Sequence, residues 1–182
     1  MIEIALADPS RIRPFDKDGI LQVVIETPQG SRNKYAFDHE RNVIVLKKIL
    51  PAGMIFPYNF GFVPSTLAED GDPLDVLVLM EEAAFPGCVL DARIIGVIEG
   101  EDELDGGATQ RNDRLLAVAT MSQTYEDVHS VDDLPSQLSK SLQEFFVNYP
   151  KVLSGKTYKL LGVHGLKDAE KLVDAAIRCT QS

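Results

Sequence analysis

The stretch Glu69-Asp70-Gly71-Asp72-Pro73-Leu74-Asp75-Val76-Leu77-Val78-Leu79-Met80 places three aspartates within six residues, directly before an apolar run. The alternating valines and leucines favour a strand, and the glycine and proline favour a tight turn in front of it. Carboxylates this close repel one another unless a cation compensates their charge. Hard oxygen ligands suit Mg²⁺, Ca²⁺ or Mn²⁺. The stretch therefore predicts a metal site in a turn that a strand anchors.

Three other interpretations compete with this metal site. A solvated acidic turn is a common fate of clustered Asp and Gly residues. A calcium loop of the EF-hand type, counted from Asp70, needs Gly at its sixth position, but Asp75 stands there and an apolar run follows it. A helix N-terminus capped by aspartate is disfavoured by the same apolar run. On the residues alone, the solvated turn and the metal site both stay open.

Length and charge limit the class of protein. The 182 residues are enough for a self-sufficient core, and we expect one domain over residues 1–182. Lys and Arg total 18 against 28 for Asp and Glu, and the net charge of −10 opposes binding to nucleic acid or to an anionic membrane. No apolar run approaches the length of a membrane span, and the acidic N-terminus is not typical of a signal peptide. Cys88 and Cys179 are far apart, which fits free thiols in a reducing cytoplasm.

Six short runs rich in β-forming residues predict a mainly β fold in the first two thirds of the chain. They cover residues 21–26, 33–37, 43–46, 76–80, 89–98 and 115–119, and turn residues separate them. This spacing is typical of an antiparallel barrel or sandwich. The aromatic segment 51–64 is expected to be a loop packed over the barrel. Segment 99–112, which is acidic and glycine-rich, is the candidate for a flexible insertion.

The last third changes to a helical period. Asp133 is expected to cap a helix that has Pro135 in its first turn and an apolar face ending near Pro150. A second helix is expected to start by Asp168. The three histidines form no ligand spacing and are expected to be structural or exposed; they are His39, His129 and His164.

With these elements in place, residues 70–76 resemble the signature of the soluble, Mg²⁺-dependent inorganic pyrophosphatases of the β-barrel type, Asp-x-Asp-Pro-x-Asp followed by an apolar residue. The resemblance continues through a glutamate strand at residues 24–28, a lysine strand at 33–35, an aromatic loop at 56–62 and a helix at 145–149. It implies an OB-like five-stranded β-barrel flanked by C-terminal helices. It also implies a homo-oligomer that hydrolyses pyrophosphate to two phosphates with water activated by several Mg²⁺ ions.

The resemblance also assigns roles to single residues. Asp70 and Asp75 would hold the activating metal ions, and Asp102 would complete the metal shell. Asp72 would be the base that takes a proton from water. The remaining roles are Glu26, acting through metal-bound water, and Tyr149, whose hydroxyl would bind a phosphate oxygen. The cations that would bind substrate are Lys34, Lys48, Arg114 and Lys151.

Some positions depart from the family pattern. Asn112 stands where an aspartate ligand is expected, although a shift of one residue would bring Asp113 into that metal-binding role. Lys48 stands in place of arginine and Arg114 in place of lysine, and the two cations are not equivalent at a bidentate site. The other departures, each of which removes a charge or a hydrogen bond, are Ala36, Phe56, Phe60 and Pro150.

These departures keep two alternatives beside pyrophosphate hydrolysis. One is a catalytically degenerate paralogue that binds a phosphate ligand for regulation. The other is a hydrolase of another diphosphate, such as a nucleotide or sugar diphosphate. A nucleic-acid-binding OB module is opposed by the net charge of −10. Taken singly, the lysines and arginines are more often surface charges than ligands, and Tyr149 continues an apolar helix face.

Overall fold

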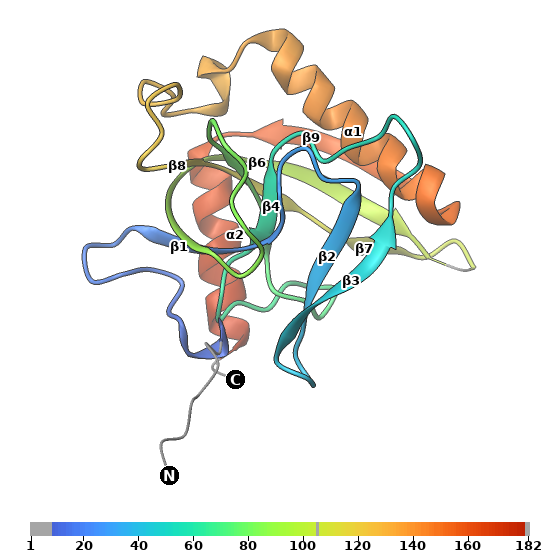
Figure 1. Ribbon diagram of the computed structural model, residues 1–182, viewed down its shortest axis with the longest axis horizontal. Coiled ribbons are helices and arrows are strands. Elements are labelled where there is room, and N and C mark those ends of the chain that lie inside the picture. Colours follow the sequence, from blue (N-terminus) through green and yellow to red (C-terminus); the bar gives the residue numbers. More distant parts are fainter. Residues whose placement is uncertain (1–8, 105, 181–182) are drawn as a thin grey trace.

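In the computed structural model, which describes residues 9–104 and 106–180, five strands of one sheet close into a ring (Figure 1). The ring runs β1–β4–β5–β8–β6 and closes because β6 pairs with β1. Its strands are β1 (Leu21–Thr27), β4 (Asn59–Phe62), β5 (Asp75–Leu79), β8 (Arg114–Ala119) and β6 (Val89–Glu103). The ring confirms the predicted OB-like barrel.

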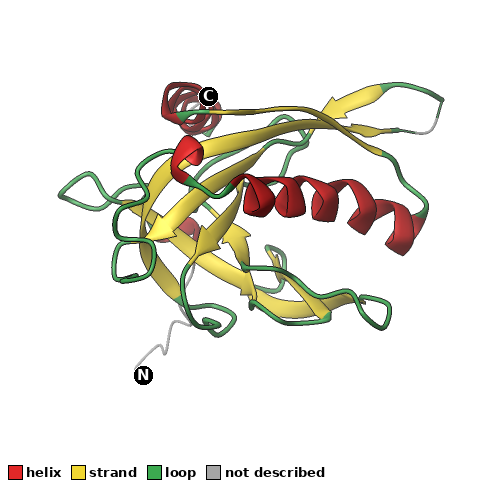
Figure 2. Ribbon diagram, turned by 90° about the horizontal axis from the view of Figure 1, so that it is seen from above, coloured by secondary structure: helices red, strands yellow, loops and turns green. Residues whose placement is uncertain are grey.

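Further strands extend the ring or stand beside it. β7 (Thr109–Arg111) and β9 (Tyr158–His164) pair with β6. β2 (Asn33–Asp38) and β3 (Val43–Ile49) form a separate antiparallel hairpin. Two short 3₁₀ helices, η1 (Pro9–Arg11) and η2 (Val131–Asp133), precede β1 and α1. The helices α1 (Ser136–Ser154) and α2 (Leu166–Cys179) lie outside the strands (Figure 2).

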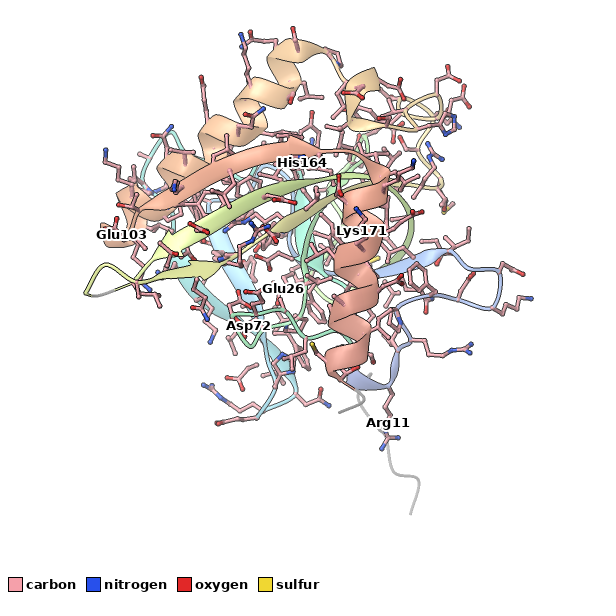
Figure 3. The ribbon with its side chains drawn as sticks, turned by 180° about the vertical axis from the view of Figure 1, so that it is seen from behind. Arg11, Glu26, Asp72, Glu103, His164 and Lys171 are labelled. Carbon is pink, nitrogen blue, oxygen red and sulfur yellow. The ribbon has the colours of Figure 1, made fainter. Side chains whose placement is uncertain are left out.

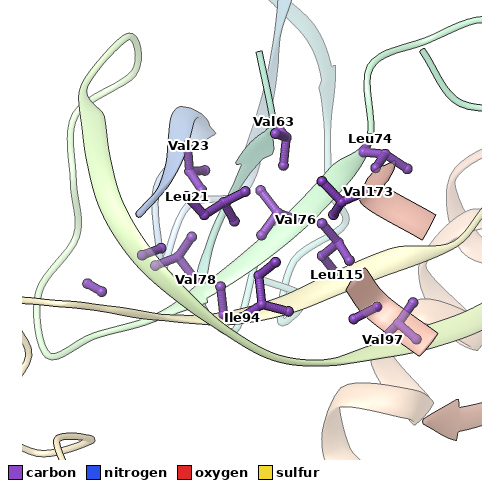
Figure 4. Packing of buried hydrophobic residues seen from close by; sticks show 14 of the residues in the cluster. Leu21, Val23, Val63, Leu74, Val76, Val78, Ile94, Val97, Leu115 and Val173 are labelled. Atoms are coloured by element: carbon purple, nitrogen blue, oxygen red, sulfur yellow. The ribbon is translucent and has the colours of Figure 1, made fainter. Parts of the chain in front are cut away.

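The barrel strands contribute to two cores, because successive side chains on a strand point to opposite faces. One core, drawn in Figure 4, contains Val76 and Val78 of β5 and is covered by Ala169, Val173 and Ala176 of α2. The other contains Leu77 and Leu79 of β5 and is covered by Leu142, Phe146 and Tyr149 of α1. β5 is therefore buried on both faces, and the turn before it stands on a fixed support.

The start of α1 differs from its prediction. Asp133 does not cap this helix but belongs to η2, where its carboxylate accepts the N–H groups of His129 at 2.9 Å and Ser130 at 2.8 Å. Pro135 occupies the residue before α1. The capping signal was real, but it serves the short 3₁₀ turn that precedes the helix.

The end of α1 differs as well. The helix continues past Pro150 to Ser154 and ends where Gly155 takes a left-handed φ of 69°. A proline inside a helix costs a hydrogen bond and a steric clash. Phe146 and Tyr149 precede it and are buried in the core, and this packing favours continuation of the helix.

Two segments expected to be loops contain strands. β6 continues to Glu103 and pairs with β7, so segment 99–112 is largely a hairpin rather than a flexible insertion. The aromatic segment contains β4, in which Gly61 allows close approach to β1 because a Cβ there would overlap the backbone carbonyl of Val24. In the described residues, no helix has the length and apolar character needed to cross a membrane.

Candidate active site

A cavity of about 230 Å³ is lined by the barrel, the β2–β3 hairpin, the turn before β5 and α1. Its charged lining residues are Glu26, Lys34, Lys47, Asp70, Asp72, Asp75 and Arg114. The other polar or ionisable groups are His39, Asn112 and Tyr149. The rest of the lining is Ala36, Phe37, Phe56, Phe60, Phe62, Pro73 and Phe146. The cavity thus contains both carboxylates and cationic side chains, and most of its apolar wall is aromatic.

The turn before β5 brings two of these carboxylates together. The Asp72 N–H donates to Asp70 Oδ1 at 3.1 Å, and the Ala68 N–H donates to the Asp72 carbonyl at 2.8 Å. Gly71 has φ of 90°, which residues with a Cβ rarely adopt. The turn and the strand that follows it confirm the geometry expected from the sequence.

Glu26 reaches the cavity through an irregularity in strand pairing. The register of β1 against β4 shifts between Ile25 and Thr27, so Glu26 is the extra residue of a β-bulge. Glu26 is 8% exposed, and its Oε1 accepts the Phe37 N–H at 2.7 Å. Burial raises the pKa of Glu26 to about 7, with the charges of Asp75 and Asp72 adding to the rise. Figure 3 shows Glu26 and Asp72 in the same part of the molecule.

Asp75 and Asp70 in this cavity also have raised pKa values. Burial raises the pKa of Asp75 to about 6, although Arg114 and Lys34 pull it down. Burial, followed by the neighbouring charge of Asp72, raises the pKa of Asp70. Asp70 and Asp75 are thus partly buried beside other negative charges, a situation that a bound cation relieves.

The strand topology places Arg114 beside Asp75. The two residues are register partners at the start of the parallel strands β5 and β8. Arg114 Nε lies 3.8 Å from Asp75 Oδ2. The guanidinium is therefore a fixed positive charge next to the acidic turn.

Lys34 is held over aromatic rings. Its Nζ lies 5.4 Å from the ring centre of Tyr149 and 5.8 Å from that of Phe60. Burial lowers the pKa of Lys34, but Tyr149, Asp75 and Glu26 together outweigh burial and raise it. Lys34 therefore stays charged in the cavity.

The structure brings together seven of the residues that the sequence suggested. They are Glu26, Lys34, Asp70, Asp72, Asp75, Arg114 and Tyr149. Asp102 does not line the cavity, but its Oδ2 accepts the side-chain amide of Asn112 at 2.7 Å, and Asn112 does line it.

Three further suggested residues lie elsewhere. Asp113 accepts the Gly100 N–H at 2.9 Å and forms an ion pair with Arg111 at 2.8 Å, on a different part of the surface. Lys48 and Lys151 are exposed and do not line the cavity. Of the two neighbouring residues, Asn112 lines the cavity and Asp113 does not.

Two ionisable lining residues were not suggested by the sequence. Lys47 lines the cavity in place of Lys48, because the pairing of β2 with β3 shifts between Lys34 and Tyr35 and leaves Lys47 as the extra residue. His39 is exposed, as expected, but it also lines the cavity and packs edge-on against Phe37 at 4.9 Å between ring centres. No pattern in the sequence signals the bulge that selects Lys47.

The donor set fits a hard divalent cation that keeps part of its water. Within the described residues, no three His, Cys, Asp or Glu side chains are grouped closely enough to enclose an ion by themselves. Mg²⁺ is commonly bound by one or two carboxylates, several waters and substrate phosphates. Carboxylates with raised pKa values around one cavity match that mode of binding.

Comparison with known proteins gives one consistent result. The model of a family described as inorganic pyrophosphatase matches residues 23–181. An inorganic pyrophosphatase of Synechocystis sp. is 39% identical over 175 residues, 96% of this chain and 98% of that protein. One from Nostoc sp. is 40% identical over 171 residues, 94% of this chain and 98% of that protein.

Solved structures agree with the sequence comparison. The crystal structure of inorganic pyrophosphatase from Thermus thermophilus matches with a TM-score of 0.88 and 34% identity, covering 97% of this chain and 100% of that chain. The inorganic pyrophosphatase from Helicobacter pylori matches with a TM-score of 0.82 and 30% identity, covering 99% of each chain. With the barrel, the acidic turn and the cavity already in place, these matches show that the chain belongs to the inorganic pyrophosphatase family.

Proposed function

We propose that this chain is one inorganic pyrophosphatase domain that hydrolyses pyrophosphate to two phosphates with Mg²⁺ as cofactor. The observation that carries the proposal is the convergence on one cavity of four carboxylates and three cations. Pyrophosphate is a compact polyanion, so its site needs cations around the phosphoryl oxygens and carboxylates that retain metal ions beside them.

The carboxylates divide the work. Asp70 and Asp75 would hold the metal ions, with Glu26 acting through their water shell. Bound Mg²⁺ would lower the pKa of water and neutralise charge on the phosphoryl oxygens. Asp72 is the base, since its carboxylate has no hydrogen-bond or ion-pair partner among the described residues and is free to accept a proton.

The cations and the tyrosine bind the substrate. Lys34, Lys47 and Arg114 supply positive charge to the phosphoryl oxygens, and the Tyr149 hydroxyl donates to one of them. Asp102 does not line the cavity but accepts a hydrogen bond from the Asn112 side chain, and it thereby holds Asn112 in the cavity wall. We keep Lys48, Lys151 and Asp113 out of this assignment because they do not line the cavity.

The deciding assay is phosphate release from pyrophosphate with and without Mg²⁺. Wild-type protein is expected to need Mg²⁺, and Asp72→Asn is expected to lose at least about a hundredfold in kcat, because the shape is kept while the basic carboxylate is removed. Asp91→Asn, an exposed position on β6, is the matched control. Comparable turnover by Asp72→Asn would refute the assignment of the base.

The same assay separates the two alternative functions. A degenerate paralogue would bind Mg²⁺ and phosphate without turnover. A hydrolase of another diphosphate is favoured by the apolar groups Ala36, Phe56 and Phe60 on the cavity wall; it would release phosphate or a monoester faster from a nucleotide or sugar diphosphate than from pyrophosphate.

We also propose a homo-oligomer in a reducing compartment such as the cytoplasm. Exposed apolar side chains, Phe85 at 69% and Met121 at 92%, and the free thiols of Cys88 and Cys179 support this. Sedimentation equilibrium at the monomer mass would contradict the oligomer.

A further inference from the structure

The guanidinium of Arg114 packs against two aromatic rings. Its central carbon is 4.3 Å from the ring centre of Tyr158 on β9 and 4.6 Å from that of Phe146 on α1. Arg114 is only 4% exposed. Arginine stacks on aromatic faces through its planar, weakly hydrated guanidinium, which a lysine ammonium does not match.

Tyr158 is itself held in one position. It is 2% exposed, and its hydroxyl donates to the Asn112 carbonyl at 3.2 Å. The same carbonyl accepts from Arg114 Nη1 at 3.3 Å. Gly100 leaves the space for this hydroxyl, since a Cβ at that position would overlap it. The ring of Tyr158 thus contacts the Arg114 side chain, and its hydroxyl binds the backbone carbonyl of Asn112, two residues before Arg114.

This clamp sets the direction in which the guanidinium faces. With both rings packed against the guanidinium and Nη1 on the Asn112 carbonyl, Nε lies 3.8 Å from Asp75 Oδ2. A free arginine loses much rotamer freedom when it binds an anion, and a preorganised arginine loses less. The residue that orders the arginine therefore contributes to the site without touching it.

We propose that Tyr158 is a positioning residue that acts through Arg114: together with Phe146 it clamps the guanidinium between the acidic turn and the phosphate-binding cavity. Tyr158 does not line the cavity and is not a catalytic residue. The consequence for phosphate binding rests on the proposed function, whereas the clamp itself does not.

The clamp is tested directly by ¹⁵N relaxation of the Arg114 Nε–H group, without substrate or metal. We expect an order parameter near the rigid limit of about 0.85 in wild type and Tyr158→Phe, and below about 0.6 in Tyr158→Leu. Leu142→Ala is the control, because Leu142 is buried in the same core but lies outside the cavity lining; its Arg114 should stay rigid. If Tyr158→Leu fails to fold, Phe146→Leu removes the other ring and takes the place of Tyr158→Leu in the experiment.

The functional arm measures the affinity for imidodiphosphate, a non-hydrolysable analogue of pyrophosphate, by calorimetry with Mg²⁺. Tyr158→Leu should weaken imidodiphosphate binding roughly tenfold when it is the only substitution. The same change should weaken binding much less in an Arg114→Lys background, because the effects of substitutions at coupled residues are not additive. An equal loss in both backgrounds would mean that Tyr158 acts only on the stability of the fold.

The outcomes for the clamp and for the proposed function are distinct. A mobile Arg114 in wild-type protein, or a rigid one in both leucine variants, overturns the clamp whatever the activity. A rigid Arg114 in wild-type protein that releases no phosphate from pyrophosphate leaves the clamp standing and removes the proposed function.

Discussion

Two of the charged residues in the cavity, Glu26 and Lys47, lie at β-bulges, where one strand has an extra residue relative to its partner. Glu26 is the extra residue of β1 against β4, and Lys47 is the extra residue of β3 against β2. A β-bulge bends its strand and redirects a side chain, and bulges are frequent beside active sites. The identity of the cavity residues therefore depends on local register as much as on residue type.

The two neighbouring lysines of β3 allow a matched test of this point. Lys47→Ala should raise KM for pyrophosphate by about fivefold, which corresponds to about 1 kcal/mol for a partly solvated charge contact. Lys48→Ala should change it by less than about twofold, because Lys48 does not line the cavity. Steady-state kinetics on both variants measures the two KM values. Equal changes in KM would contradict the assignment of Lys47, rather than Lys48, to the cavity.

At the scale of elements, Glu81 joins the segments that follow the parallel strands β5 and β8. Its Oε1 accepts the N–H groups of Thr124 at 2.6 Å and Gln123 at 2.9 Å, and the Ser122 hydroxyl at 3.1 Å. The Thr124 N–H first, and then the N–H of Glu81 itself, lower the pKa of Glu81 from 4.5 to about 2, and the Thr124 and Ser122 hydroxyls contribute further. One carboxylate thus organises the turn after β8.

The lowered pKa fixes the sign of a pH effect. Because the folded value lies below the unfolded one, Glu81 contributes stability that is fully present above about pH 4.5 and is lost as the pH falls towards 2. Glu81→Gln should therefore lower the thermal midpoint at pH 6, and its difference from wild type should shrink towards pH 2.

The control for this experiment is Glu82→Gln, at the neighbouring exposed residue. Its difference from wild type is expected to be small and constant across the same pH range. Thermal unfolding followed by circular dichroism measures both variants, and a pH-independent deficit for Glu81→Gln would contradict the carboxylate's role.

At the scale of the whole molecule, the net charge of −10 and the carboxylates around one cavity oppose folding until cations bind. A ligand that binds only the folded state stabilises it by mass action. Stability and metal binding should therefore be linked in this protein.

We expect Mg²⁺ at about 100 times its Kd to raise the thermal midpoint of the wild type by about 5 to 10 °C. Asp75→Asn should lose most of that increase, whereas Asp91→Asn should keep it. Differential scanning calorimetry with and without Mg²⁺ measures the shift, and an undiminished shift in Asp75→Asn would exclude Asp75 as a ligand.

Local sequence was sufficient for the acidic turn and for most of the barrel. The turn at Asp70–Asp75 and the strand after it follow from glycine, proline and an apolar run, which act over a few residues. The predicted helix ends were less accurate. Pro150 was expected to end its helix, but the helix continues through it because the preceding side chains Phe146 and Tyr149 are packed in the core. β4, β7 and β9 were missed, since none of them carries a clean alternation of apolar and polar residues.

The sequence by itself determined the mainly β class, the cluster of aspartates and the family pattern, because each depends on short-range spacing. Only the tertiary structure decided that Lys47 and Asn112 face the cavity while Lys48 and Asp113 do not, and that Tyr158 clamps Arg114. These depend on register between strands far apart in the chain. A shift of one residue reverses the direction of a side chain and leaves no trace in the local sequence.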